Sequence, residues 1–347
     1  MRTLVTVQRV KEVFPVHGLD KEGKEFLADA VERVTFEGVA WSCVVKKAEN
    51  FKPGDLALYF EIDSVLPEHP VFEFLRPRKF RLKTARFLKT TLSQGLCMPI
   101  SLVSAFGGNP AALKLGEDLT DLLGVRKYEP PVPMDLTGSI IGGFPDCMPK
   151  TDESRIQSFP EVLKELRGKQ VSITIKCDGT SGSYACWKGE FYVCGRNFRL
   201  GKTALNPHWQ VARKYNLAEK LKDTGMALQG EVVGPGLQKN RLGLEGIEIR
   251  FFTLYDMAQR RYLPQNELER FCARLELPIA PVERIVENFD MTVAQLLAMA
   301  DGPYPGTKNL REGIVLRPYA EECFSSVLGG RLSIKVVSNA YLEGGGE

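Results

Sequence analysis

The chain has 347 residues, 44% of them hydrophobic and 26% charged, a composition typical of a globular protein long enough for two domains. A formal net charge of +3 is too small to indicate a polyanionic partner, so only local charge clusters can do so. The eight cysteines form no C-x-x-C pair and only three histidines are present, which argues against a structural zinc site. Without a signal-peptide core or an apolar run of bilayer length, we expect an intracellular, cytoplasmic protein with no membrane contact.

The first 125 residues are dominated by short strand-like segments. Alternating or β-rich runs occur at 4–10, 40–46, 56–62 and 94–100, and a Lys-Pro-Gly-Asp turn precedes the third of them. Several short strands in so few residues are typical of a small barrel rather than of a β-α-β unit. We therefore predict an all-β domain of the OB-barrel type at 1–125.

A basic segment lies within this predicted barrel at 76–89, where the sequence reads RPRKFRLKTARFLK. Seven of these fourteen residues are basic, none is acidic, and Phe80 and Phe87 are interleaved among them. The pattern suits a nucleic-acid surface, on which cations neutralise phosphates and aromatic rings stack on bases. It suits equally well an exposed barrel edge that charges protect against aggregation.

A segment rich in glycine and proline at 126–149 predicts a linker, and the chain beyond it alternates between helix-like and strand-like patterns. We predict a second, α+β domain at 150–347. Its expected helices lie at 159–166, 209–222, 265–275 and 292–299, and its expected strands at 171–176, 189–194, 226–233, 247–254 and 313–318.

Six short motifs follow one another in this second region. Each occurs by chance in many proteins and alone is more typical of an exposed turn or strand, but their order, spacing and residue types agree. They are Ile175-Lys176-Cys177-Asp178-Gly179-Thr180, Cys194-Gly195-Arg196-Asn197, Gly230-Glu231-Val232-Val233-Gly234, Phe252-Thr253-Leu254-Tyr255-Asp256, Arg311-Glu312-Gly313-Ile314-Val315-Leu316 and Ser333-Ile334-Lys335-Val336.

The first motif offers a lysine nucleophile at the end of a strand-like run. A free lysine amine has a pKa of about 10.4 and attacks only when neutral, a form that burial or a nearby divalent cation favours. Two residues on in an extended segment, Asp178 would share a face with Lys176, and Gly179 permits close approach of a phosphate or ribose. Asp178, Glu231 and Glu312 together would suit Mg²⁺, which carboxylates hold through its water shell.

The ordered motifs resemble those of the covalent nucleotidyltransferases, the superfamily of ATP-dependent DNA ligases, RNA ligases and mRNA capping enzymes. Segments outside them are similar to the fifth family of ATP-dependent RNA ligases, in which an OB domain precedes the nucleotidyltransferase domain. These are Trp41–Lys47, Phe51–Pro67, Leu92–Leu96, Leu123–Pro131 and Phe144–Gln157. The domain order agrees, because the 12 residues after Lys335 are too few for a further domain, so the additional domain is expected upstream.

The resemblance implies an ATP-dependent polynucleotide (RNA) ligase that seals 3′-OH/5′-phosphate nicks through a lysyl-AMP intermediate, in RNA repair. It implies a nicked duplex RNA or RNA/DNA substrate with a ribonucleotide at the 3′-OH end, and we expect a monomer. Lys176 would be the nucleophile, and Asp178, Glu231 and Glu312 would hold Mg²⁺ or Mn²⁺. Catalysis would rest on Lys176, Glu231, Glu312 and Lys335, and ATP would contact Lys150, Gln157, Ile175, Arg196, Phe252 and Val315.

One departure from the family pattern and several alternatives stay open. Several RNA ligase branches carry a second lysine in the last motif, where this chain has Val337, so Lys335 would act alone or with Arg331. The same chemistry would serve an ATP-dependent DNA ligase or a capping guanylyltransferase. A non-catalytic OB nucleic-acid-binding protein is the alternative from another class, against which the intact Lys176, Asp178, Glu231, Glu312 and Lys335 argue.

Overall fold

The computed structural model describes residues 3–129, 139–321 and 323–344, and these divide into two compact units. One comprises the chain up to Glu129 with Gln157–Pro160, and the other comprises 139–156 and the chain from Glu161 onwards. Residues 130–138 of the predicted 126–149 linker lie outside the described residues. No helix within the described ranges is long and apolar enough to span a membrane.

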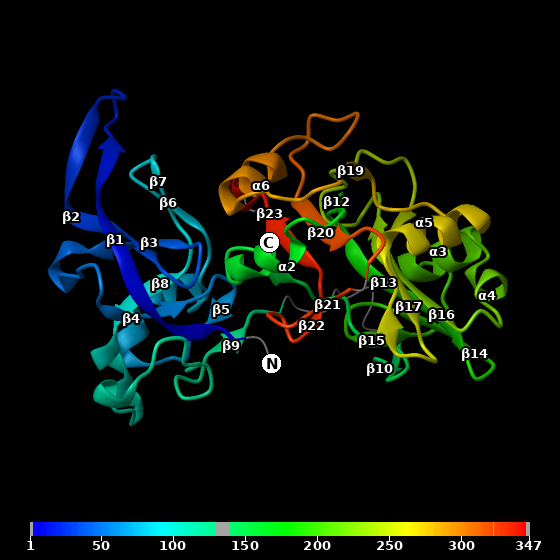
Figure 1. Cartoon of the computed structure of the whole chain (residues 1–347), viewed down its shortest axis with the longest axis horizontal. Helices are drawn as coiled ribbons and strands as arrows, with labels where there is room; N and C mark the ends of the chain where they lie inside the picture. The colour runs from blue at the N-terminus through cyan, green and yellow to red at the C-terminus, as the bar shows by residue number, and fades with distance from the viewer. Residues whose placement is uncertain (1–2, 130–138, 322, 345–347) are drawn as a thin grey trace. The chain divides into compact units, whose positions relative to one another are not determined.

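The N-terminal unit is built on a five-stranded antiparallel sheet in the order β3-β2-β1-β4-β8 (Figure 1). Gln94, two residues before β8, donates its N–H to Ser42 O of β3 at 2.9 Å, so the two edge strands approach each other at this point. Its strands are β1 (Val5–Leu19), β2 (Glu25–Phe36), β3 (Ser42–Lys46), β4 (Leu56–Phe60) and β8 (Leu96–Pro99). The shorter elements are β5 (Ser64–Val65), β6 (Ala85–Phe87), β7 (Thr91–Ser93), β9 (Arg126–Lys127), η1 (Lys47–Glu49), η2 (Pro70–Arg78), η3 (Ile100–Phe106) and η4 (Pro110–Ala112).

The long β1–β2 hairpin is the main difference from the strands predicted in this unit. We expected a strand at 4–10 only, whereas β1 continues to Leu19 and pairs with β2, which the sequence did not indicate. β2 exposes apolar Phe26 and Leu27 as well as charged Glu25 and Asp29, and it buries few side chains, so its alternation is weak. The bulges beside Val10 and Pro15 let the hairpin bend while it stays paired, since each extra residue locally interrupts the ladder.

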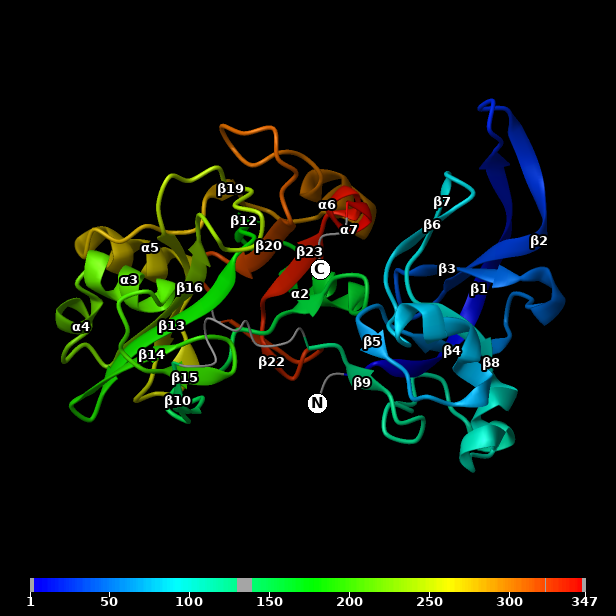
Figure 2. The same ribbon diagram turned by 180° about the vertical axis from the view of Figure 1, so that it is seen from behind.

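The C-terminal unit contains two sheets. The seven-stranded sheet has the order β10-β15-β14-β13-β16-β17-β18, with helices α3, α4 and α5 packed on one face, as Figure 2 shows. Its strands are β10 (Ile140–Gly143), β13 (Thr180–Trp187), β14 (Glu190–Cys194), β15 (Phe198–Leu200), β16 (Met226–Val233), β17 (Glu248–Asp256) and β18 (Arg261–Tyr262). The helices are α3 (Pro207–Lys214), α4 (Leu217–Lys220) and α5 (Gln265–Arg274).

The five-stranded sheet of this unit has the order β11-β23-β20-β12-β19, and its ladders are antiparallel except for the short parallel β11–β23 pair. Its strands are β11 (Ser154–Arg155), β12 (Val171–Lys176), β19 (Val282–Val286), β20 (Gly313–Pro318) and β23 (Ile334–Val337). The remaining elements are η5 (Pro160–Val162), α2 (Leu163–Leu166), α6 (Val293–Ala300), α7 (Asn339–Glu343), β21 (Phe324–Ser325) and β22 (Gly330–Arg331).

Apolar side chains of α2 and α6 cover the five-stranded sheet, so β12 and β20 lie in a buried core. β12 alternates apolar residues with Ser172 and Thr174, and β20 contains the apolar run Ile314-Val315-Leu316, which is why the sequence predicted both. The helix predicted at 209–222 is instead two short helices, α3 and α4, separated at Asn216, whose left-handed φ of 49° interrupts the first of them. β13 was not predicted, because Ser181, Gly182 and Ser183 give it little strand propensity.

Candidate active site

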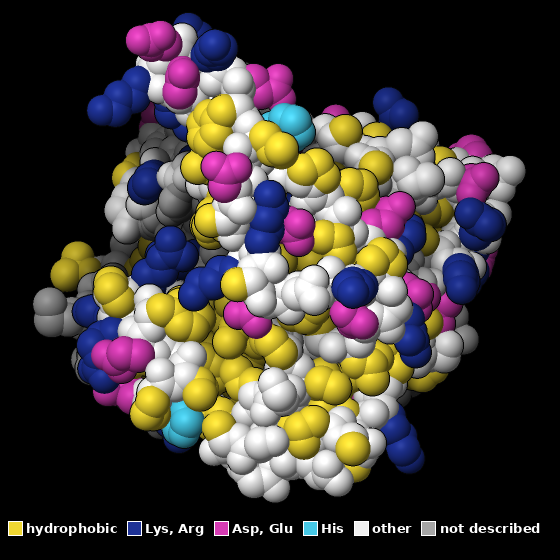
Figure 3. Space-filling view, turned by 90° about the vertical axis from the view of Figure 1, so that its left-hand side faces the viewer, with side chains coloured by type: hydrophobic (Ala, Val, Ile, Leu, Met, Phe, Trp, Pro, Cys, Tyr) yellow, Lys and Arg dark blue, Asp and Glu magenta, His cyan; other side chains and the backbone are white. Residues whose placement is uncertain are grey.

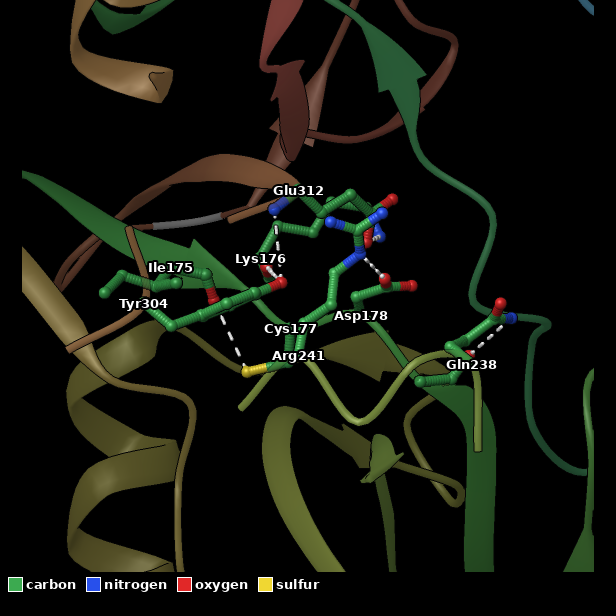
Figure 4. A network of polar contacts seen from close by, with 9 residues as sticks. Ile175, Lys176, Cys177, Asp178, Gln238, Arg241, Tyr304 and Glu312 are labelled. Atoms are coloured by element: carbon green, nitrogen blue, oxygen red, sulfur yellow. Dashed lines mark hydrogen bonds and ion pairs between the residues drawn. The ribbon is translucent and has the colours of Figure 1, made fainter. Parts of the chain in front are cut away.

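Lys176 is the last residue of β12, where that strand lies beside the start of β20. Its Nζ is 2.8 Å from Oε2 of Glu312, the residue before β20, and the two side chains are 21% and 8% exposed (Figure 4). Lys176 pairs with Gly313 in the ladder. Gly313 has a φ of 153°, and a Cβ there would lie 2.1 Å from Val336 O, so the turn into β20 needs glycine. The motif therefore fixes Glu312 directly beside the lysine.

The three residues after Lys176 carry the chain from the five-stranded sheet into the seven-stranded one, where β13 begins at Thr180. A Cβ on Gly179 would lie 2.3 Å from Val232 O, so only glycine lets this crossing pass so close to β16. In β16, Glu231 pairs with Ser181 of β13. This crossing brings the carboxylate of one sheet near the lysine of the other.

Asp178 lies within the crossing and is held by two side chains that the sequence motifs did not include. Its Oδ2 is 3.0 Å from Nε of Arg241, and its carboxylate accepts a hydrogen bond from Tyr341 of α7. The Arg241 guanidinium also lies 4.7 Å from the centroid of the Tyr341 ring. Burial raises the pKa of Asp178 although Tyr341, Lys176 and Arg241 all oppose the shift.

Glu231 completes a group that we call the nucleophile cluster, which consists of Lys176, Asp178, Glu231 and Glu312. Burial raises the pKa of Glu231 to about 8; Lys176 opposes this shift, and the Glu312 and Asp178 carboxylates reinforce it. The three carboxylates therefore interact electrostatically, and together they make an environment that favours an additional positive charge. Among the described residues, no three or more acidic, histidine or cysteine side chains form a direct metal-ligand group.

Lys335 and Val315 lie on the face of the sheet that carries Lys176. Val315 of β20 pairs with Thr174 on one side and with Lys335 of β23 on the other. Because directly opposite residues share a face and side chains alternate along a strand, Lys176 two residues beyond Thr174 shares that face too. Ile175, between Thr174 and Lys176, is 3% exposed.

The other residues predicted to contact nucleotide lie in different settings. Phe252 of β17 is partly exposed, with the Arg317 guanidinium 5.5 Å from its ring centroid. Arg196 contacts Asp152 at 2.7 Å, and Lys150 Nζ donates to Asn197 Oδ1 at 3.0 Å. Gln157 belongs to the segment that clusters with the N-terminal unit, and its 1% exposed side-chain amide has no hydrogen-bond partner among the described residues.

Tyr304 is a residue of this site that the sequence analysis missed. Its hydroxyl donates to Lys176 O at 2.9 Å and accepts from Glu312 N–H at 3.1 Å, so one side chain joins the backbones of both partners. Burial raises the pKa of this hydroxyl well above its usual range, which keeps it a neutral donor. Tyr304 lies in a Pro-Tyr-Pro turn 128 residues after Lys176, and nothing in that spacing indicates the contact.

A second buried charged group, the arginine cluster, consists of Glu153, Arg317 and Arg331. Arg317 Nη2 donates to Glu153 Oε1 at 2.5 Å, and Arg331 Nη1 donates to Thr253 Oγ1 of β17 at 2.6 Å. Burial would raise the pKa of Glu153, but the two guanidiniums outweigh it and lower that pKa to about 2. Burial, reinforced by Arg317, lowers the pKa of Arg331 to about 10, so Arg331 stays charged at neutral pH.

Comparison with known proteins gives matches to both parts of the chain. An RNA ligase family model matches residues 169–337, and an OB-fold domain model matches residues 4–100. No curated protein matches significantly. The chain is similar to the solved structure of Naegleria gruberi RNA ligase with PPi, at 34% identity and a TM-score of 0.83, covering 99% of this chain and 98% of that chain.

Two point mutants of the same Naegleria gruberi ligase give similar agreement. The mutant with ATP and Mn has 34% identity and a TM-score of 0.82, with 98% of this chain and 97% of that chain covered. A different mutant with AMP and Mn has 34% identity and a TM-score of 0.84, with 98% of each chain covered. These matches confirm the predicted order of an OB-fold domain followed by a ligase domain with antiparallel sheets. By its sequence and its fold, this chain belongs to the RNA ligase family.

Proposed function

We propose that this RNA ligase uses ATP to seal 3′-OH/5′-phosphate nicks through a lysyl-AMP intermediate on Lys176. The observation that carries the proposal is the amine at the end of β12, 2.8 Å from the Glu312 carboxylate and two residues before Asp178. The similar Naegleria gruberi structures with ATP, AMP, PPi and Mn support ATP as the nucleotide. We place the protein in the cytoplasm, as a monomer acting in RNA repair.

In the first step, Lys176 Nζ attacks the α-phosphorus of ATP, the N–P bond forms, and pyrophosphate leaves. The amine must lose its proton first, and Glu312 is the carboxylate placed to accept it. The adenylyl group then passes to the 5′-phosphate of the nick. Attack of the 3′-hydroxyl on that phosphate forms the phosphodiester and releases AMP.

Asp178, Glu231 and Glu312 would hold a divalent cation, Mg²⁺ or Mn²⁺, through its water shell. The donor set fits such an ion, because mutual repulsion and burial already disfavour the charged form of Glu231. When bound, the cation offsets the negative charge of the triphosphate. Tyr304 keeps the Lys176 and Glu312 backbones in place around it.

The remaining predicted residues would bind the nucleotide. Lys335 would contact the α-phosphate, since it lies on the Lys176 face of the sheet. Phe252 and Val315 would enclose the adenine from the two sheets, and Arg196 would serve the ribose or the nick end. Lys150, Gln157 and Ile175 would complete the contacts to phosphates and base.

We assign nucleic-acid binding to residues 1–125, the linker to 126–149 and adenylyl transfer to 150–347. In the basic segment, Lys79, Lys83, Arg86 and Lys89 are exposed, whereas Phe80 is 4% exposed and belongs to the core, so Phe80 does not serve as a stacking platform. Figure 3 shows basic side chains interspersed with acidic and apolar ones on one face of the molecule. The exposed cations would therefore bind the phosphate backbone locally.

The direct test is incubation with α-labelled ATP and Mn²⁺, followed by a denaturing gel. Lys176→Ala should lose the label by about 10³-fold or more, because the amine beside Glu312 is removed. Lys222→Ala, at an exposed lysine, is the matched control and should label normally. Labelling of Lys176→Ala at the control level would show that another nucleophile is used.

Substrate tests separate RNA sealing from the related chemistries. A nick with a 3′-ribonucleotide should be sealed faster than one with a 3′-deoxyribonucleotide, and ATP should be used in preference to GTP. Changing Lys79, Lys83, Arg86 and Lys89 to glutamine should weaken RNA binding and lower its salt slope by about one for each phosphate that is no longer neutralised. Lysyl-AMP formation in that variant should stay normal, and unchanged RNA binding would count against the assigned surface.

A further inference from the structure

Residues 234–247, which connect β16 to β17, lie over the crossing that contains Asp178. We call them the crossing loop. Gln238 Nε2 donates to Gly179 O at 3.3 Å, and Arg241 Nε is 3.0 Å from Asp178 Oδ2 (Figure 4). Asn309 Nδ2 donates to Arg241 O at 2.8 Å. The loop is thus attached to the first motif by side-chain contacts at two successive residues of that motif.

The Arg241–Asp178 contact is largely shielded from water. The two side chains are 14% and 8% exposed, and the Tyr341 ring lies against the guanidinium. A buried carboxylate requires a nearby positive charge, because burial otherwise disfavours its ionised form. Lys176, which is paired with Glu312, supplies part of that charge, and Arg241 adds to it from outside the nucleophile cluster.

The same carboxylate is one of the three that would hold the divalent cation. A guanidinium and a divalent cation beside one carboxylate repel each other, so binding of one disfavours binding of the other. Gly234 and Gly243 have φ values of 132° and 67°, conformations that glycine adopts readily and that turn the loop back over the crossing. A guanidinium released from Asp178 presents a planar fork of donors that suits phosphate oxygens.

We propose that Arg241 is a positioning residue that neutralises Asp178 in the nucleotide-free protein and transfers to the outer phosphates of ATP when cation and nucleotide bind. The proposal rests on the function proposed above. It makes the crossing loop responsive to the nucleotide and makes Arg241 and the divalent cation competitors for Asp178. Pyrophosphate, the leaving group, would be the part of ATP that Arg241 contacts.

The first experiment measures Mn²⁺ binding to the nucleotide-free protein from the electron paramagnetic resonance signal of free Mn²⁺. Arg241→Gln should bind Mn²⁺ about 5-fold more tightly than the unchanged protein, because the competing cation is gone. Lys239→Gln removes the same charge from an exposed position two residues earlier and should bind as the unchanged protein does. Unchanged or weaker binding by Arg241→Gln would overturn the competition.

The second experiment measures the ATP dependence of lysyl-AMP formation at saturating Mn²⁺. Arg241→Gln should raise the KM for ATP about 10-fold, and Arg241→Lys should recover part of the loss because it keeps the charge without the fork. An unchanged KM would overturn the transfer to the phosphates. If the unchanged protein forms no lysyl-AMP, the proposed function fails, whereas the Mn²⁺ titration still decides the competition.

A shift in melting temperature shows whether Arg241→Gln folds. If it does not, the comparison passes to Arg241→Lys and Asp178→Asn. Asp178→Asn should weaken Mn²⁺ binding several-fold, and adding Arg241→Lys to it should have no further effect, because the shared partner is gone. Independent effects of the two changes would overturn the proposal.

Discussion

The C-terminal unit contains two groups of buried charge, and they are arranged in opposite ways. In the nucleophile cluster three carboxylates outnumber one lysine, and the pKa of Glu231 is raised to about 8. In the arginine cluster two guanidiniums outnumber one carboxylate, and the pKa of Glu153 is lowered to about 2. The nucleophile cluster therefore has excess negative charge that a further cation would neutralise. In the arginine cluster, by contrast, the carboxylate is fully paired with guanidiniums.

The direction of the carboxyl pKa shift distinguishes buried charges that stabilise the fold from those that serve chemistry. Glu153 and its arginines connect the two sheets, since Arg317 belongs to β20 and Arg331 reaches Thr253 of β17. Around Glu231, burial and two carboxylates outweigh the opposing cations, so its environment is unfavourable until a further cation arrives. Perturbed carboxyl groups are common at functional sites, and here the direction of the shift separates the two roles.

The largest expected effect comes from breaking the arginine cluster. Glu153→Gln leaves two buried guanidiniums without their carboxylate and should lower the free energy of unfolding by about 3–5 kcal/mol at pH 7. Glu161→Gln, at an exposed glutamate, is the control and should change little. Because the pKa of folded Glu153 is depressed to about 2, its contribution is present above the unfolded value of 4.5 and is lost as pH falls toward 2. Urea unfolding at pH 7 and pH 3 measures both; a loss below about 1 kcal/mol at pH 7 would contradict the assignment.

The nucleophile cluster should show the opposite pH dependence in chelator-treated protein. Below pH 4.5 Glu231 is protonated in both states, but between 4.5 and about 8 the unfolded chain releases the proton that the folded protein retains. Stability should therefore fall as pH rises through this window and then level off above it. Glu231→Gln should remove most of this loss in urea unfolding series. Parallel stability curves for the two proteins would show that Glu231 titrates normally.

The smallest effect is expected from Tyr304→Phe, which tests how the nucleophile cluster is held. The change removes hydrogen bonds to Lys176 O and from Glu312 N–H and should cost about 1–2 kcal/mol of stability. It should also slow lysyl-AMP formation while leaving the KM for ATP nearly unchanged, because the nucleophile is displaced but the nucleotide contacts are kept. Tyr319→Phe removes a hydroxyl that donates to Glu269 and is the control. Equal labelling rates for the two variants would indicate a purely structural role for Tyr304.

Much of the active site could be predicted because its residues lie at the ends of strands with strong local signals. β12 is an alternating strand pattern and β20 a short apolar run, so Lys176 and Glu312 at their ends are marked in the sequence itself. Arg241 and Tyr304 could not be found this way, since both lie in irregular loops and contact the motif only through the fold. β2 and β13 were missed for a related reason, because weakly alternating residues in β2 and small ones in β13 are held in strands by their neighbours.

The bulge in β17 determines which side chains of that strand face the core. Gln229 pairs with Thr253 and Gly230 with Phe251, which leaves Phe252 as the supernumerary residue. Before it, Ile249 and Phe251 point into the helix-covered core; after it, Leu254 does. Phe252 and Thr253 consequently both turn toward Arg317 and Arg331. Deleting this single residue would restore strict alternation with Ile249, Phe251 and Leu254 still in the core, so the insertion adds one outward-facing side chain beside Thr253 without disturbing the packed face.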